Sequence, residues 1–201
     1  MKKRIAVFAS GSGSNFQAIV DVVKAGMLPA EISLLVCDQP GAFVIERAKA
    51  NEVPCFIFKA KEFPSKADYE KEIAALLQDL NVDLIVLAGY MRLIGSTLLK
   101  EYEGRIVNIH PSMLPDFPGK DAIGQALAAK AKWTGVTIHF VDEGMDTGPI
   151  IVQERIRIEE NETRDSLQKK IQLVEHKLYP SILHMLLTQG EVTNGEKART
   201  Y

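Results

Sequence analysis

Short apolar runs alternate with amphipathic stretches along the first half of this chain. Nearly continuous runs, which are typical of strands buried on both faces, occupy residues 4–10, 32–37, 54–58, 83–88 and 106–109. The stretches between them predict helices at about 15–25, 43–51, 67–80 and 97–102. Ser14 and Gln17 have the spacing of a capping box at the start of the first helix. Strands that alternate with helices predict βαβ units and a mostly parallel, twisted sheet.

The pattern changes in the second half of the chain. A proline-rich loop at 111–119 leads into a helix predicted at about 122–131, and two further strands follow at 136–141 and 150–158. In the last of these strands, isoleucines alternate with arginines. Such alternation predicts a half-exposed, antiparallel strand at an edge of the sheet.

A long C-terminal helix is predicted at about 164–189. Thr163 is placed to cap its start, and Pro180 should kink or break it because proline lacks the backbone N–H that the helix needs. Residues 190–201 contain the turn signal Asn194-Gly195 and few apolar positions, so we expect a loose tail or a small hairpin. The elements together predict an α/β fold of three layers. It has a mostly parallel twisted sheet, Rossmann-like in its N-terminal half, with an antiparallel edge strand and a long C-terminal helix.

Composition and charge argue against several classes of protein. A length of 201 residues suits a single domain, 1–201, with a core of its own. The formal net charge of −2 gives no electrostatic footprint for nucleic acid or an anionic membrane. The first apolar run ends at Gly11, too early for a signal peptide, and no run approaches the roughly 20 apolar residues of a membrane span. Cys37 and Cys55 lie in apolar segments, and we expect buried thiols in a cytoplasmic protein.

The loop Gly11-Ser12-Gly13-Ser14-Asn15 separates the first strand from the first helix. Successive backbone N–H groups and the helix dipole make such a loop attractive to phosphate. A dinucleotide site would need a third glycine where Phe16 stands, although Asp38 is placed to bind a ribose hydroxyl in that case. A P-loop would need a lysine that the loop lacks. The loop therefore favours a single phosphate, with a plain tight turn as the structural alternative.

Asn108 and His110 interrupt the apolar run of the fifth strand. Two residues apart in an extended chain, they project from the same face, and Pro111 should end the strand. An amide and an imidazole are thus presented at the C-terminal edge of the sheet, where ligands bind in open α/β folds. The structural alternative is a polar pair that only satisfies the end of a strand.

A second polar cluster, 142–149, follows the strand at 136–141. Its Asp146 reaches His110 if the two strand ends are neighbours, and a carboxylate beside an imidazole favours the charged imidazole. An acidic surface turn is the alternative. His139 is expected either to line the same cleft or to belong to the core. No cluster of cysteine and histidine has metal-ligand spacing, so we expect no metal.

Three segments together resemble the folate-dependent formyltransferases: the glycine loop, the cluster from Asp142 to Ile150, and Asn108-Ile109-His110-Pro111-Ser112-Met113-Leu114-Pro115. The resemblance covers nearly the whole chain, in order. The glycine loop and Gly89-Tyr90-Met91-Arg92 narrow it to members that formylate a glycinamide ribonucleotide in purine synthesis. It implies transfer of the formyl group from 10-formyltetrahydrofolate, a co-substrate, to the amine of 5-phosphoribosylglycinamide. It also implies small-molecule partners only, and a monomer or homodimer.

The same resemblance implies roles for individual residues. The ribonucleotide would be held by Gly13, Ser14, Asn15 and Glu175. The folate would be held by Lys66, Met91, Arg92, Leu93, Ile94, Asn108, Val141, Glu143 and Asp146. Within the domain, 1–105 would be the phosphate-binding half, 106–190 the folate-binding and catalytic half, and 191–201 a tail. Lys66 stands where an arginine is common in the family, and residues 120–123 lack the histidines that many members carry, so we assign no catalytic role there.

The residue types suit direct attack of a primary amine on the formyl carbon, which creates a tetrahedral oxyanion. Asn108 can donate a hydrogen bond to that oxygen, and a protonated His110 can donate another and then protonate the leaving N10 atom. Asp146 can orient His110 and relay the proton that the amine loses. Neither cysteine accompanies a local base, so we expect no covalent enzyme intermediate.

Four other functions compete with this interpretation. A methionyl-tRNA formyltransferase would need more chain after Glu159 and a basic surface, and a formyltetrahydrofolate hydrolase would need a domain before Arg4. A non-catalytic nucleotide- or folate-binding module would need the glycine loop but not the set Asn108, His110 and Asp146. Phe16 disfavours an NAD-dependent oxidoreductase.

Overall fold

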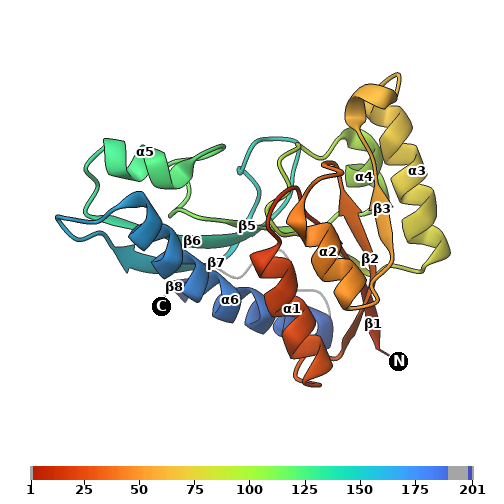
Figure 1. The fold of residues 1–201 in the computed structure, drawn as a ribbon, viewed down its shortest axis with the longest axis horizontal. Coiled ribbons are helices and arrows are strands. Elements are labelled where there is room, and N and C mark those ends of the chain that lie inside the picture. Colours follow the sequence, from red (N-terminus) through yellow and green to blue (C-terminus); the bar gives the residue numbers. More distant parts are fainter. Residues whose placement is uncertain (1, 190–198, 201) are drawn as a thin grey trace.

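The computed structural model describes residues 2–189 and 199–200. Its strands form one sheet and are β1 (Lys3–Phe8), β2 (Ala30–Cys37), β3 (Cys55–Ile57), β4 (Leu84–Leu87), β5 (Ile106–His110), β6 (Trp133–Phe140), β7 (Ile150–Arg157) and β8 (Arg199–Thr200). The α-helices are α1 (Ser14–Lys24), α2 (Phe43–Ala50), α3 (Lys66–Asp79), α4 (Ser96–Glu101), α5 (Ala122–Ala128) and α6 (Arg164–Gln189), with a short 3₁₀ helix at Ala60–Glu62 (Figure 1).

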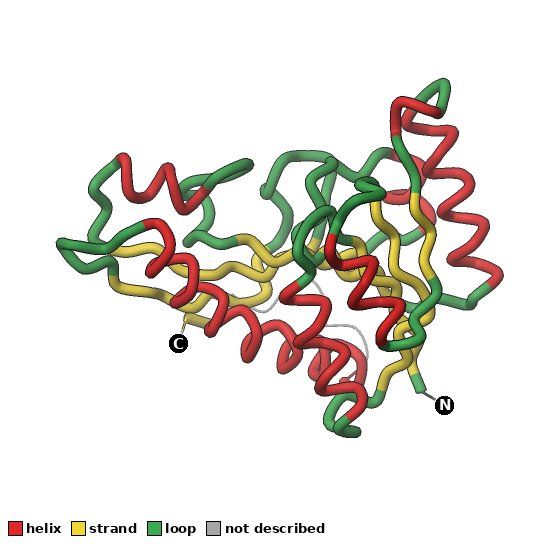
Figure 2. The backbone as a smooth tube through the Cα atoms, in the orientation of Figure 1, coloured by secondary structure: helices red, strands yellow, loops and turns green. Residues whose placement is uncertain are grey.

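The sheet has the order β3-β2-β1-β4-β5-β6-β7-β8. Neighbouring strands from β3 to β5 are all parallel, which confirms the predicted α/β fold with a mostly parallel sheet. The chain builds outward from β1 to β3 and then returns to place β4 on the other side of β1. A crevice for ligands is expected at such a reversal, outside the carboxyl ends of the strands. The loops that follow β1, β4 and β5 gather there, above the middle of the sheet (Figure 2).

The predicted antiparallel strand is confirmed, but its place at the edge is not. Both β6 and β7 run antiparallel to the preceding strand, and β7 buries Val152 and Ile156 while it exposes Arg155 and Arg157. The outer side of β7 pairs with the two-residue strand β8. Residues 190–198 and 201 of the predicted tail or hairpin lie outside the described residues. No helix among the described residues is long and apolar enough to cross a membrane.

Helices cover both faces of the parallel part of the sheet, which confirms the three layers. On one face α1, α2 and α6 contribute the buried side chains Phe16, Ile19, Val44, Ile171, Tyr179 and Leu183. On the other face α3 and α4 contribute Tyr69, Ile73, Leu77 and Leu98. Figure 1 shows α3 on one side of β1–β3 and α1 and α2 on the other, with α6 running from α1 to β7. Burial of these side chains is the main source of the stability of the fold.

The helix ends differ from the sequence predictions in two places. The residue that caps α1 is Gly13, in the left-handed region at φ 73°, and no side chain makes a capping hydrogen bond, so the Ser14–Gln17 capping box was wrong. Helix α6 continues through Pro180 without a break. Tyr179 and Leu183 are buried on either side of the proline and hold both parts of the helix on the core. The predicted cap of α6 is confirmed, because Thr163 Oγ1 accepts the Ser166 N–H at 3.1 Å.

Candidate active site

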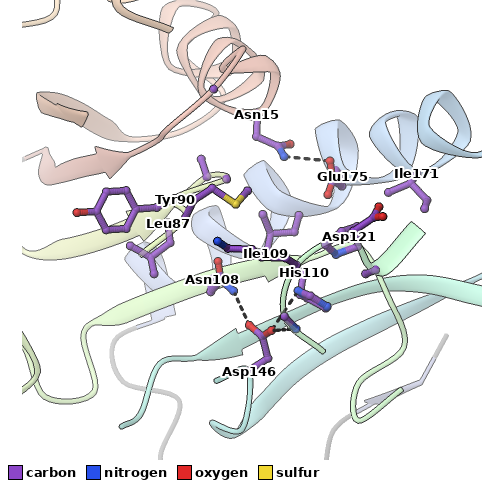
Figure 3. Close-up of a pocket in the computed structure, with 18 of the residues that line it drawn as sticks. Asn15, Leu87, Tyr90, Asn108, Ile109, His110, Asp121, Asp146, Ile171 and Glu175 are labelled. Carbon is purple, nitrogen blue, oxygen red and sulfur yellow. Dashed lines mark hydrogen bonds and ion pairs between the residues drawn. The ribbon is translucent and has the colours of Figure 1, made fainter. Parts of the chain in front are cut away.

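A cavity of about 430 Å³ opens at the carboxyl ends of β1, β4 and β5. Its walls come from the glycine loop after β1, the turn after β4, the end of β5, the loop after β6 and one face of α6. In Figure 3, Asn108, Ile109 and His110 lie across the middle, with Asn15 and Glu175 on one side and Asp146 on the other. The volume is in the range of sites for small molecules.

Asp146 connects the polar side chains at the end of β5. Its Oδ2 lies 3.4 Å from His110 Nδ1 and accepts the Gly119 N–H at 2.7 Å. Its Oδ1 accepts a hydrogen bond from Asn108 Nδ2 at 3.4 Å and lies 3.7 Å from His139 Nε2. The structure therefore brings together the three residues that the sequence singled out as catalytic candidates (Figure 3).

The contact between Asp146 and His110 arises differently from the way the sequence predicted it. The end of β6 does not lie beside the end of β5, because the two strands are antiparallel and Phe140 pairs with Val107. The loop after β6 instead turns back along β5 and delivers Asp146 to His110. Asp146 itself has a φ of 56°, a conformation that is uncommon for residues other than glycine and clusters at functional sites.

The ring of His110 is held between a carbonyl and a carboxylate. Its Nε2 lies 2.9 Å from the carbonyl oxygen of Phe117, and a carbonyl can only accept, so Nε2 carries a proton and donates it. Nδ1 faces Asp146. A second proton on Nδ1 would make the ring a cation with the carboxylate as its partner. This arrangement suits a proton donor in an otherwise buried position, since His110 is 5% exposed.

His139 belongs to the cavity, which decides between the two alternatives that its sequence position left open. Its Nδ1 donates to the carbonyl of Phe140 at 2.8 Å, and in the neutral ring its Nε2 accepts from Asn108 Nδ2 at 3.1 Å, whereas in the cationic ring Nε2 donates to Asp146. Asn108 thus has its amide N–H groups directed at His139 and Asp146. The two contacts fix the orientation of the amide.

Burial and hydrogen bonding act in opposite directions on Asp146. Burial of the carboxyl group acts to raise its pKa. Contacts with His139, with the Gly119 N–H and with His110 outweigh burial, and the pKa of Asp146 lies below its usual value. The carboxylate is therefore ionised at neutral pH and available as a partner for a cationic imidazole.

The glycine loop forms the opposite side of the cavity. Backbone and side chains of Gly11–Asn15 line it at the start of α1, and Asn15 Nδ2 donates to Glu175 Oε2 of α6 at 3.0 Å. Glu175 is buried, and burial raises its pKa to about 7, although the hydrogen bond from Asn15 acts to lower it. Residues from both ends of the chain therefore meet at this side, next to the N-terminus of a helix.

The turn after β4 forms an apolar wall. Met91, Arg92, Leu93 and Ile94 line the cavity there, and Val141 in the loop after β6 lines it as well. Met91 and Leu93 are 60% and 46% exposed, which is unusual for such side chains outside a binding surface. Lys66 and Glu143 do not line the cavity. Lys66 lies at its rim, where Nζ donates to the Leu93 carbonyl at 3.0 Å.

Residues 3–183 match the model of the family described as "Formyl transferase". The chain belongs to the formyl transferase family. It is 54% identical to phosphoribosylglycinamide formyltransferase of Bacillus subtilis over 98% of this chain and all of the relative. It is 33% identical to the human trifunctional purine biosynthetic protein adenosine-3, of which it spans 20%. In that relative the shared region is one part of a longer chain.

Solved structures of formyl transferases have the same fold. The glycinamide ribonucleotide transformylase 1 of Geobacillus kaustophilus superposes with a TM-score of 0.91 at 61% identity, over 93% of this chain and all of the other. A phosphoribosylglycinamide formyltransferase from Bacillus halodurans gives a TM-score of 0.91 at 57% identity, over 96% of this chain and all of the other.

Sequence reasoning missed several parts of this formyl transferase site. The Phe117 carbonyl and the Gly119 N–H are backbone groups of the proline-rich loop. Residue types in the sequence cannot predict such backbone contacts. An ion pair of 2.7 Å joins Asp121 and Arg164, which both line the cavity and lie 43 positions apart in the sequence. Asp38 is buried under Ser10 and Arg92 and is not open to a ribose hydroxyl. Among the described residues, no group of three or more acidic, histidine or cysteine side chains is arranged to hold a metal.

Proposed function

We propose that this chain transfers the formyl group of 10-formyltetrahydrofolate to the glycinamide amine of 5-phosphoribosylglycinamide, a step of de novo purine (IMP) biosynthesis. The observation that carries the proposal is the meeting of Asn108, His110 and Asp146 between a phosphate-type loop and an apolar wall. The phosphoribosylglycinamide formyltransferase and the glycinamide ribonucleotide transformylase, at 54% and 61% identity over their whole length, support formyl transfer to this ribonucleotide.

The ribonucleotide occupies the side of the cavity next to α1. Gly13, Ser14 and Asn15 bind its phosphate, because the N-terminus of α1 offers free backbone N–H groups and the positive end of a helix dipole. Glu175 faces the same space and binds the glycinamide ribose portion. This orientation directs the amine toward the end of β5.

The folate occupies the other side, against the turn after β4. Exposed apolar side chains and backbone groups there suit a flat heteroaromatic ring, and Arg92 suits the oxygen atoms of a folate. The proposed contacts are Met91, Arg92, Leu93, Ile94, Asn108, Val141 and Asp146, with Lys66 and Glu143 further out at the rim. The formyl group then lies between the two substrates, at Asn108 and His110.

The reaction begins when the amine attacks the formyl carbon. The formyl oxygen gains negative charge, and Asn108 and His110 stabilise it by hydrogen bonds; one such donor is worth roughly 10²–10³ in rate. The amine loses a proton, which Asp146 relays, directly or through water. His110 protonates N10 as the tetrahedral intermediate collapses, and the formylated amide and tetrahydrofolate leave. Addition and proton transfer suffice for these steps, so the proposal invokes no metal.

The chain acts as one domain, 1–201, with a phosphate-binding half at 1–105, a folate-binding and catalytic half at 106–190 and a tail at 191–201. The hydrogen bond between Asn15 and Glu175 joins these two halves at the cavity and supports a single site formed by both. The net charge of −2 supports small molecules, rather than nucleic acid or membranes, as partners of a cytoplasmic monomer or homodimer.

An assay with purified protein tests the proposal. Glycinamide ribonucleotide and 10-formyltetrahydrofolate are supplied together and separately, and loss of the formyl folate is followed. Consumption that requires both substrates is the expected result. Consumption of the folate without the ribonucleotide would show a hydrolase, and no consumption under either condition would show a binding protein.

A further inference from the structure

A buried carboxylate lies behind the wall that the folate is proposed to occupy. Asp38, directly after β2, has a side chain that is 2% exposed. Its Oδ1 accepts a hydrogen bond from Ser10 Oγ at 2.5 Å, and its Oδ2 accepts one from Arg92 Nε at 2.8 Å. Gln39 Nε2 approaches the same Oδ2 at 3.2 Å. None of these contacts involves Asn108, His110 or Asp146.

The same network holds the backbone of the turn after β4. Ser10 Oγ accepts the Met91 N–H at 2.9 Å, and the Ser10 N–H donates to the Gly89 carbonyl at 3.1 Å. Ser10 is therefore bonded to the turn through its backbone and its side chain, and to Asp38 through its hydroxyl. Asp38 thus ties the ends of β1 and β2 to the segment that forms the apolar wall.

The contact with Asp38 leaves most of the Arg92 guanidinium available. It uses the Nε–H, one of the five N–H donors of the group, and the terminal amino groups Nη1 and Nη2 remain for other acceptors. Arg92 lines the cavity and its side chain is 34% exposed. A free arginine side chain has many rotamers, and a fixed one loses less entropy when a ligand binds.

We propose that Asp38 is a positioning residue for the co-substrate: it fixes Arg92 so that the terminal amino groups face the carbonyl or carboxylate oxygens of the folate. The inference rests on the proposed function, because it assumes that Arg92 binds the folate. The Asp38 carboxylate is so deeply buried that it needs a cationic or hydrogen-bonding partner, and Arg92 is that partner. The position of Arg92 and the burial of Asp38 therefore depend on each other.

Asp38→Asn tests the proposal. Asparagine keeps the shape of the side chain but has a single acceptor oxygen, so it cannot accept the hydrogen bonds from Ser10 and from Arg92 on separate oxygen atoms. The expected result is a KM for 10-formyltetrahydrofolate that rises about ten- to a hundredfold, the range for a lost hydrogen bond to a charged group, with the ribonucleotide KM and kcat nearly unchanged. Calorimetric titration with tetrahydrofolate, which cannot transfer a formyl group, should show the same weakening.

Two further variants separate positioning from a structural role. Asp83→Asn is the control, because Asp83 likewise accepts a hydrogen bond from a cationic side chain, but at the start of β4 and away from the cavity. It should leave both KM values unchanged. In an Arg92→Lys background, which keeps the charge but lacks Nε, Asp38→Asn should cause no further loss of folate affinity.

The outcomes distinguish the two proposals. Equal rises of both KM values, or independent effects of Asp38→Asn and Arg92→Lys on folate affinity, would overturn the positioning role. An unchanged folate KM in Arg92→Lys and in Arg92→Ala would remove Arg92 from the folate site and overturn the inference, while the requirement for both substrates would still support the proposed function. Melting temperatures of all variants report whether each one folds.

Discussion

His110 contacts one backbone group and one side chain, and each contact has a separate chemical consequence. The Phe117 carbonyl fixes a proton on Nε2, and Asp146 provides a negative charge beside Nδ1. The sequence predicted the second contact, but from the assumption that the ends of two strands are neighbours, which the antiparallel pairing of β5 and β6 contradicts. It did not predict the first, because a carbonyl group is common to every residue and only the path of the loop brings this one to His110.

Replacement of His110 by alanine should lower kcat by about 10²–10⁴, the usual contribution of a positioned general acid. The ribonucleotide KM should stay within about twofold, because the side chain is assigned to the proton and not to the phosphate. Steady-state kinetics with both substrates measures this. His184→Ala, an exposed position of α6, is the control. A near-normal kcat in His110→Ala would contradict the role of proton donor.

Asp146→Asn should change both catalysis and acid stability. The pKa of Asp146 is lowered in the folded protein, so its ionised form stabilises the fold above the pKa of the unfolded chain. That contribution disappears as the pH falls through the folded-state pKa. Between about pH 5 and pH 3 the free energy of unfolding should therefore fall more steeply in the natural protein than in Asp146→Asn. Urea titrations at several pH values measure the difference, and kcat of the variant should be strongly reduced.

The contribution of Glu175 to the free energy of unfolding should depend on pH in the opposite sense to that of Asp146, and Glu175→Gln should remove it. The folded-state pKa of Glu175 is raised to about 7, so the folded protein binds a proton that the unfolded chain releases above its ordinary value. Stability is lost as the pH rises from about 4.5 to 7, by roughly 3 kcal/mol at most, and the glutamine variant should not show this loss.

The same substitution separates the titration of Glu175 from that of the substrate phosphate. The pH dependence of the ribonucleotide KM near neutrality should become flatter in Glu175→Gln, because the phosphate still titrates but the carboxyl group does not. Identical KM profiles in the two proteins would remove Glu175 from the substrate site.

At the scale of elements, apolar patterns predicted nearly every strand and helix but not the direction of β6. An apolar run buried in a sheet looks the same whether its neighbour is parallel or antiparallel, because side-chain alternation does not depend on direction. The reversal of β6 therefore had to come from the structure. The 3₁₀ helix at Ala60–Glu62 was also missed, since three residues are too few to show a period.

Two glycines of the same loop should differ in how far substitution by alanine changes the ribonucleotide KM. A Cβ atom on Gly13 would lie 2.4 Å from Val44 Cγ2, and the backbone there has a φ of 73°. A Cβ atom on Gly11 would meet nothing within 4 Å. Gly13→Ala should therefore displace the start of α1 and raise the ribonucleotide KM by about tenfold or more, whereas Gly11→Ala should change it little.

Val44→Ala extends this comparison. It removes the nearest methyl group, but Val44 Cβ would still lie 2.7 Å from the new Cβ, so the rescue of Gly13→Ala should be partial. Similar ribonucleotide KM values in Gly11→Ala and Gly13→Ala would show that the loop does not need this conformation. The folate KM serves as the internal control in each variant.

At the scale of the whole molecule, α6 connects parts of the chain that the sequence places far apart. It packs on α1 and the sheet and carries Glu175 to Asn15, 160 positions earlier. Fully buried Tyr179 on the same helix directs its hydroxyl at the carbonyls of Leu87 and Val107, at 2.8 and 3.1 Å. Sequence reasoning predicted the helix and its length but not these contacts, because packing partners depend on strand order.

Tyr179→Phe should lower the free energy of unfolding by roughly 1–3 kcal/mol, since two buried carbonyl groups lose the same donor. Both carbonyls belong to strands that end in the cavity, and the ring keeps its place in the core. Activity at low temperature should therefore be retained while the melting temperature falls. Chemical denaturation followed by circular dichroism and by the fluorescence of Trp133 should give one shared transition, and separate transitions would contradict joint folding of the two halves.

The amide of Asn108 has both of its N–H groups engaged before any substrate binds, one well at 3.1 Å and one poorly at 3.4 Å. In the proposed reaction, the formyl oxygen that develops negative charge would compete for the weaker of these two hydrogen bonds and displace Asp146 Oδ1 from it. Asp146 Oδ1 would then lose the Asn108 N–H as a donor. Its lone pair would become free to accept a proton at the moment when the attacking amine must give one up. Oxyanion binding and base strength are thus coupled through one shared donor, and without a formyl group the carboxylate stays partly occupied.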